Sequence, residues 1–145
     1  MTAPTGDPFG RGLLVDNGDL VFSDGQLAEV AGIANLVQAL TLRILTPGGS
    51  DRFNTTYGLD VTQAFTRPNS TRMVKELLKL NLVGTVGADP RVSAVREVTF
   101  DDDPARRAAD PAAATTARVS RKWTAEVHVD TVTGTPVTLR ADVEG

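Results

Sequence analysis

The clearest alternation of apolar and polar positions lies near the end of the chain, between Arg121 and Val143. Every second residue from Trp123 to Val129 is apolar, and a second alternating run follows the turn at Thr133-Gly134-Thr135. A period of two residues predicts strands, and one apolar set per strand predicts a hairpin with a single buried face. The predicted buried residues are Trp123, Ala125, Val127, Val129, Val137, Leu139, Ala141 and Val143.

Two longer segments carry the period of an α-helix instead. Ser23 and Gln26 have the spacing of a capping box, which predicts a helix that runs from Leu27 to the stop at Pro47-Gly48-Gly49. Asn69 or Ser70 can cap a second helix that ends at Gly84 or Gly87. The predicted face of this second helix comprises Met73, Val74, Leu77, Leu78, Asn81 and Leu82.

The remaining segments predict shorter elements. Asn17-Gly18 lies between two short apolar runs and predicts a small hairpin. Alternation from Arg91 predicts a further strand, with Val92, Ala94, Val98 and Phe100 on its buried side. Residues 63–65 predict one helical turn, residues 1–12 a flexible arm, and residues 101–116 a loop insertion.

These elements together predict an α+β fold. Residues 13–145 are expected to form one compact domain, with two main helices packed on a small mixed or antiparallel sheet that ends in the C-terminal hairpin. A chain of 145 residues is long enough to bury a substantial core without disulfides or a metal.

Composition narrows the possible functions. The net charge is -3 and only 5% of residues are aromatic, so neither a basic surface nor a stacking platform for nucleic acid is expected. There is no cysteine, which excludes disulfides and thiolate metal sites. No basic segment precedes an apolar signal region, and no apolar run has a length near the ~20 residues of a membrane span, so we expect synthesis in the cytoplasm and no membrane insertion.

Catalytic chemistry has little support in the sequence. His128 is the only histidine, and no Gly-x-Ser-x-Gly motif is present, so neither a nucleophilic triad nor a histidine metal site is expected. The run Asp101-Asp102-Asp103 could bind a cation, although such runs are more often solvated loops. Because two carboxylates suffice for glycoside hydrolysis, an enzyme of that kind stays open as an alternative. We expect no catalytic residue, cofactor or metal, and no enzyme.

Two motifs in a fixed order resemble a known family. The first is Leu-Arg-Ile-Leu-Thr-Pro-Gly-Gly at residues 42–49, followed by Phe53 and Tyr57-Gly58-Leu59. The second is Asp89-Pro90-Arg91-Val92, which lies between a predicted helix and a predicted strand. This arrangement resembles the gene-25-like, or W-like, baseplate proteins of contractile phage tails and contractile injection systems. The family often has Glu where this chain has Asp89.

The resemblance implies a structural role. Six copies would ring the tube at the top of a baseplate, and their strands would join those of the first sheath ring. Expected partners are the sheath protein, the baseplate wedge proteins, and the inner tube or spike and hub proteins. The chain would be part of an assembled tail or injection particle. Some members of the family are described as lysozymes, so the alternative implied here is a peptidoglycan-degrading, lysozyme-like enzyme.

The resemblance also assigns roles to residues. Asp89, Pro90 and Arg91 would contact the core of the wedge, while Thr46, Gly49, Tyr57 and Gly58 are structural positions of the first motif. An alternative for Arg91 is an internal contact with Asp89.

The hairpin gives the expected role a physical basis, because the free edge of its outer strand could accept a strand from a neighbouring chain. Its polar face could fix the register of that strand, or could simply be solvated. The residues expected to face the sheath are Lys122, Glu126, His128, Arg140 and Asp142. A soluble adaptor that belongs to no particle is a further alternative.

Overall fold

The structure is a computed structural model that describes residues 6–120 and 122–144. Residues 1–5 of the predicted arm, Arg121 at the start of the predicted hairpin, and Gly145 lie outside the described residues. Within the described ranges, no helix is both long enough and apolar enough to cross a membrane.

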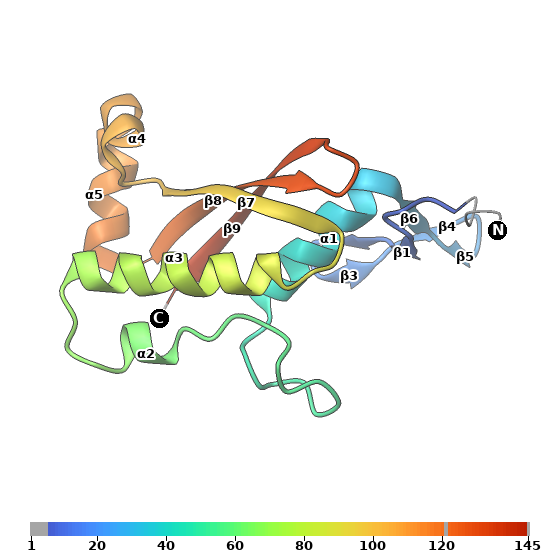
Figure 1. The fold of residues 1–145 in the computed structure, drawn as a ribbon, viewed down its shortest axis with the longest axis horizontal. Helices are drawn as coiled ribbons and strands as arrows, with labels where there is room; N and C mark the ends of the chain where they lie inside the picture. Colours follow the sequence, from blue (N-terminus) through green and yellow to red (C-terminus); the bar gives the residue numbers. More distant parts are fainter. Residues whose placement is uncertain (1–5, 121, 145) are drawn as a thin grey trace.

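A three-stranded antiparallel sheet organises the fold (Figure 1). Its strands follow one another in the order β7-β8-β9, so the C-terminal hairpin is confirmed and β7 is added to it. The alternating apolar residues of the hairpin are all buried, while the residues between them are exposed or half-buried. The strands are β7 (Val92–Phe100), β8 (Lys122–Thr131) and β9 (Pro136–Glu144).

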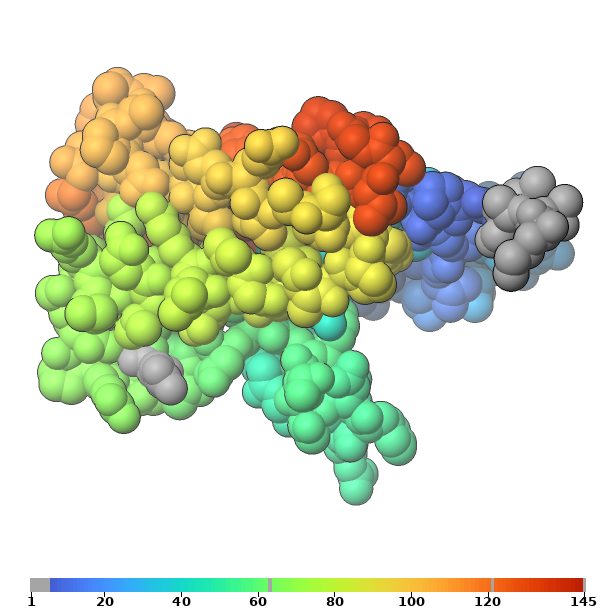
Figure 2. Space-filling model, in the orientation of Figure 1, coloured from blue at the N-terminus to red at the C-terminus, as the bar shows by residue number. Residues whose placement is uncertain are grey.

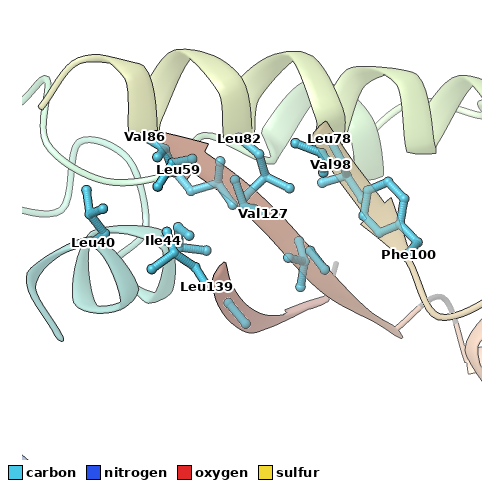
Figure 3. Close-up of a cluster of buried hydrophobic side chains, with 14 of the residues drawn as sticks. Leu40, Ile44, Leu59, Leu78, Leu82, Val86, Val98, Phe100, Val127 and Leu139 are labelled. Atoms are coloured by element: carbon cyan, nitrogen blue, oxygen red, sulfur yellow. The ribbon is translucent and has the colours of Figure 1, made fainter. Parts of the chain in front are cut away.

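Two helices, α1 (Gly32–Leu45) and α3 (Thr71–Gly87), cover the apolar face of this sheet. Figure 3 shows Leu78 and Leu82 of α3 pointing toward Val98 and Val127 of the sheet, with Ile44 of α1 beside Leu139. The short helix α2 (Thr62–Phe65) adds Phe65, whose ring stacks on Trp123 with centroids 6.4 Å apart. The predicted α+β class is therefore confirmed.

The predicted second helix and helical turn are also confirmed. The Ser70 hydroxyl accepts a hydrogen bond from the backbone amide of Met73, as expected of an N-cap, and α3 ends at Gly87. Its fully buried residues recur every four positions, at Val74, Leu78, Leu82 and Val86. Met73 lies at the margin of this stripe and is half exposed.

Three small antiparallel strand pairs precede α1, and two of them are hairpins. The first helix therefore begins later than predicted, at Gly32. The Asn17-Gly18 turn joins β2 to β3 as predicted, and Asp24-Gly25 joins β4 to β5 in the same way, with positive φ at both turn residues. Ser23 and Gln26 are thus paired strand residues and not a capping box. The bounds are β1 (Arg11–Leu13), β2 (Val15–Asp16), β3 (Asp19–Leu20), β4 (Phe22–Ser23), β5 (Gln26–Leu27) and β6 (Glu29–Ala31).

The predicted flexible arm is wrong for the residues closest to the domain. Phe9 is buried in the main core, and Arg11 begins β1, which pairs with β6. A single large aromatic side chain therefore fixes the entry of the chain, because its burial removes apolar surface from water.

The pairing of β7 with β8 is irregular, and one residue of β7 that was predicted to be buried is therefore exposed. Register shifts lie between Val92 and Ala94 and again between Val95 and Glu97. Each extra residue reverses the alternation of faces, so Ala94 is exposed while Val98 and Phe100 point inward again. The prediction that Ala94 is buried is wrong for this reason.

The predicted loop insertion at residues 101–116 is also wrong, since this segment contains α4 (Pro104–Ala109) and most of α5 (Pro111–Ser120). Both helices begin with proline after an aspartate, and the Asp110 carboxylate accepts a hydrogen bond from the Ala113 amide. Proline at the first helical position followed by alanines favours a helix. Ala117 of α5 reaches the main core beside β8.

Leu78 tests the packing of α3 on the sheet. We expect Leu78→Ala to lower the free energy of unfolding by roughly 2–5 kcal/mol, because the side chain is fully buried and leaves a cavity. Leu80→Ala on the exposed side of the same helix should change it by less than about 0.5 kcal/mol. Urea denaturation of both variants makes the comparison, and equal effects would contradict this packing.

Candidate interaction site

The Asp89-Pro90-Arg91 motif forms a closed clamp where α3 gives way to β7. The Asp89 carboxylate accepts three hydrogen bonds from Arg91: from the backbone amide at 2.9 Å, from Nε at 2.9 Å and from Nη2 at 2.8 Å. Asp89 is buried, whereas a quarter of the Arg91 side chain stays exposed. Hydrogen bonding to Arg91 lowers the pKa of Asp89 below its ordinary value.

The same arginine holds the N-terminal segment. Its Nη1 donates to the carbonyl oxygen of Phe9 at 3.1 Å, and Nδ2 of Asn35 donates to that oxygen at 2.8 Å. The Phe9 amide in turn donates to the Asp7 carboxylate at 2.9 Å. The internal Asp89–Arg91 contact that the sequence left open is therefore present. Contact of this motif with a wedge partner stays a prediction.

The residues of the first motif converge in the base of one loop. Leu59 donates its amide to the Thr46 carbonyl at 2.8 Å, and Gly48 donates to the Leu59 carbonyl at 2.9 Å. Gly58 has a φ of +102°, and a Cβ there would lie 2.4 Å from the Thr46 carbonyl oxygen. Only glycine fits this approach. Thr46 and Gly58 are thus structural residues.

Tyr57 and Gly49 complete the loop base. The guanidinium of Arg43 lies 5.1 Å from the centre of the Tyr57 ring, within the range of a cation–π contact. Gly49 turns the chain with a φ of +77°.

Arg43 and Gly58 of the first motif line one hollow together with Ala88, which directly precedes the second motif, so the two motifs lie close together. Phe9 and Asn35 join the second motif to the N-terminal segment and to α1, and the sequence analysis assigned them no role. The available signal for Asn35 was a polar residue flanked by Ala34 and Leu36 within an apolar stretch.

The polar face of the hairpin is organised around Glu126. Its carboxylate forms ion pairs with Nε of Arg140 from β9 and with Nη1 of Arg106 from α4, both at 2.9 Å. Nε2 of His128 lies 3.1 Å from the same carboxylate. The hydrogen bond from Arg140 lowers the pKa of Glu126.

Two further pairs cross the strands on this face. Lys122 pairs with Glu144 at 2.5 Å, and Asp142 accepts a hydrogen bond from the Thr124 hydroxyl at 2.8 Å. All five predicted residues share this face, and every one has a partner within the chain.

The outer edge of β9 is the open part of the sheet, since β9 pairs only with β8 among the described residues. Residues of an antiparallel strand alternate in the side to which their N–H and C=O groups point. The Thr131 amide donates to the Thr135 carbonyl across the turn. The odd-numbered residues of β8 therefore direct their backbone N–H and C=O groups toward β9. By register, Thr138, Arg140 and Asp142 then direct their backbone groups toward the open edge.

An apolar hollow lies at the end of this edge. Most of its lining residues are apolar, and two are acidic residues of β9: Ile44, Leu45, Pro47, Leu59, Val61, Val143, Asp142 and Glu144. Its volume is about 480 Å³. An extended segment added along β9 would therefore find both main-chain hydrogen-bonding groups and a place for an apolar side chain.

Two of the three aspartates in the Asp101-Asp102-Asp103 run are held in ion pairs, and among the described residues Asp101 is in none. Lys75 of α3 lies 2.7 Å from Asp102 and 2.5 Å from Asp103, and Arg118 lies 3.3 Å from Asp102. Asp102 is almost fully buried. These pairs dock α4 and α5 on α3, so the run is a structural hub. No group of three or more potential metal-ligating residues occurs in the described part of the chain.

Comparison with known proteins gives no match: no protein-family model, no curated protein and no solved structure is significantly similar to this chain. The resemblance to gene-25-like baseplate proteins therefore rests on the two motifs alone.

Removing the arginine of the clamp should destabilise the fold. We expect Arg91→Ala to lower the free energy of unfolding at pH 7 by about 2 kcal/mol, because it leaves a buried carboxylate without its partner. Since the folded-state pKa of Asp89 is lowered, this contribution is complete above the ordinary value of 3.8 and is lost as the pH falls through the lowered pKa. Urea denaturation across this range measures the difference.

Arg96 offers the matched control for this prediction. It pairs with Asp130 on the surface and is mostly exposed, so Arg96→Ala should cost less than about 1 kcal/mol. An Arg91→Ala effect that is equally small, or that persists unchanged at acidic pH, would show that the clamp does not act as described.

Proposed function

We propose that this chain is a structural subunit of a contractile tail or injection particle, on which the first ring of sheath protein assembles. The observation that carries the proposal is the open edge of β9, which ends beside an apolar hollow. A strand of a sheath subunit would pair with this edge and extend the three-stranded sheet to four. The ordered motifs of residues 42–59 and 89–92 support the same role.

The polar face of the hairpin supports a rigid acceptor edge. The ion pairs that Glu126 makes with Arg140 and Arg106 fasten β9 to β8 and to α4. An edge that is already ordered loses little conformational entropy when a partner strand binds. The clamp of Asp89 and Arg91 would be the second contact area, toward the baseplate wedge, through the exposed part of the arginine.

Thr138 provides a direct test of strand addition. Because its backbone amide points to the open edge, Thr138→Pro removes an outward donor and leaves the β8–β9 ladder intact. The melting temperature should change little, while the number of sheathed particles seen by electron microscopy should fall at least about tenfold.

Thr138→Val keeps the backbone amide and serves as the matched control. This variant should assemble sheaths like the wild type, although it loses the hydroxyl that lies 3.0 Å from Nδ1 of His128. Normal sheath numbers with a folded Thr138→Pro protein would rule out pairing at this edge.

One feature favours the hydrolase alternative. Burial raises the pKa of Asp101, as in a general acid, and Asp101 and Asp110 line one hollow of about 420 Å³. Against it, Arg106 and Arg140 line the same hollow, and none of the described residues that line it is an aromatic residue able to stack on a sugar.

Purified peptidoglycan distinguishes the two functions. We expect the wild-type protein to release no soluble fragments at any pH between about 4 and 8. This range includes roughly the ordinary pKa values of carboxyl groups and of histidine. Release of fragments that Asp101→Asn abolishes would support the hydrolase and overturn the structural assignment.

A further inference from the structure

The loop between Pro47 and Leu59 carries a fully exposed aromatic side chain. Phe53 has 100% of its surface accessible, the largest exposure among the large hydrophobic residues described. Figure 2 shows this segment as a separate protrusion at the bottom of the molecule, in teal and green. Exposed single apolar residues are common, but a fully exposed Phe on a projecting loop is a candidate contact point.

The tip of this loop is held in place by its own hydrogen bonds. The Asp51 carboxylate accepts the amides of Phe53 at 2.8 Å and Asn54 at 3.2 Å. Tyr57 donates its amide to the Asn54 carbonyl at 3.0 Å, and the Ser50 hydroxyl donates to the Pro47 carbonyl at 2.7 Å. The Phe53 side chain is thus presented on an ordered support, which lowers the entropy lost on binding.

An apolar groove lies elsewhere on the same chain, between the first hairpin and the outer side of α1. Its apolar lining residues are Val15, Ala34, Val37, Leu42 and Leu45, and its volume is about 540 Å³. A cavity of about 150 Å³ lined by aliphatic side chains already holds benzene. The groove is therefore large enough for a phenyl ring, and its lining has the matching chemistry.

Charge also matches between the loop tip and the groove. Arg52 is exposed beside Phe53, while Asp16 and Asp19 are exposed on the hairpin that forms one wall of the groove. Within residues 6–120 and 122–144, no ion pair involves any of these three residues. A cation beside the inserted ring and carboxylates beside the groove favour one orientation.

We infer that copies of this chain bind one another directly, with Phe53 of one copy inserted into the Val15–Leu45 groove of the next and Arg52 facing Asp16 and Asp19. Because Phe53 and the groove are different surfaces, the contact is exchanged mutually in a dimer or continued head to tail, as a closed ring or an open filament. This contact requires neither sheath nor wedge protein, so it goes beyond the proposed function.

Photo-crosslinking tests the contact in the purified full-length protein. Replacing Phe53 with p-benzoyl-phenylalanine keeps an aromatic ring at the tip and adds a reactive carbonyl. We expect a covalent oligomer, with the crosslinked peptide mapped by mass spectrometry to α1 or to the β2–β3 hairpin of another copy. A monomer after irradiation, or crosslinks that map to other surfaces, would overturn the inference.

Charge reversal gives a second readout that does not depend on the label. In sedimentation equilibrium, Arg52→Asp and Asp19→Arg should each raise the dissociation constant of self-association at least about fivefold, and the double variant should recover most of that loss. Phe53→Ser should raise it at least about tenfold. Val119→Ser, which removes an exposed apolar residue of α5, is the control and should change nothing.

A wild-type protein that stays monomeric at millimolar concentration would also overturn the inference. The β9 edge is tested separately, because Thr138 lines neither the groove nor the loop, although Leu45 borders both the groove and the hollow beside β9.

Discussion

The fold depends on covering the single apolar face of its three-stranded sheet. That face is continuous across β7, β8 and β9 and contains the largest side chains of the hairpin, among them Trp123. The sheet cannot be stable in water until helices bury it. α1 and α3 do so, and α2 and α5 add Phe65 and Ala117 at the margins. α1, α2 and α3 lie on the apolar side, and α4 reaches the polar face through Arg106, so the rest of that face and the outer edge of β9 remain available.

Much of this architecture could be predicted from local patterns. The hairpin and α3 were predictable because long alternating or helical periods dominate their sequences, and the Ser70 cap marks a boundary. The first hairpin followed from Asn17-Gly18. Asp24-Gly25 is a hairpin signal of the same kind and would have placed the start of α1 later in the chain. Ser23 and Gln26, however, also have the spacing of a capping box, which predicts a helix at the same place.

Other features required information that no short pattern contains. The bulges of β7 displace Ala94 through pairing with a distant strand, so the alternation of the segment alone was misleading. Arg91 donates a hydrogen bond to the carbonyl oxygen of Phe9, which is 82 residues away in the sequence. The periodicity of the sequence cannot predict such a contact. By contrast, the two helices at residues 104–120 could have been predicted from the sequence, because each follows an Asp-Pro pair and contains several alanines.

The construction of the 47–59 loop has an evolutionary consequence. Its base is fixed by the backbone pairing of Pro47 with Leu59 and by the tight approach at Gly58, whereas its tip contributes nothing to the main core. Insertions and substitutions at the tip can therefore accumulate without a cost to folding. The specificity of a contact made there can drift independently of the scaffold, so that one stable domain could acquire new neighbours by changing a handful of residues.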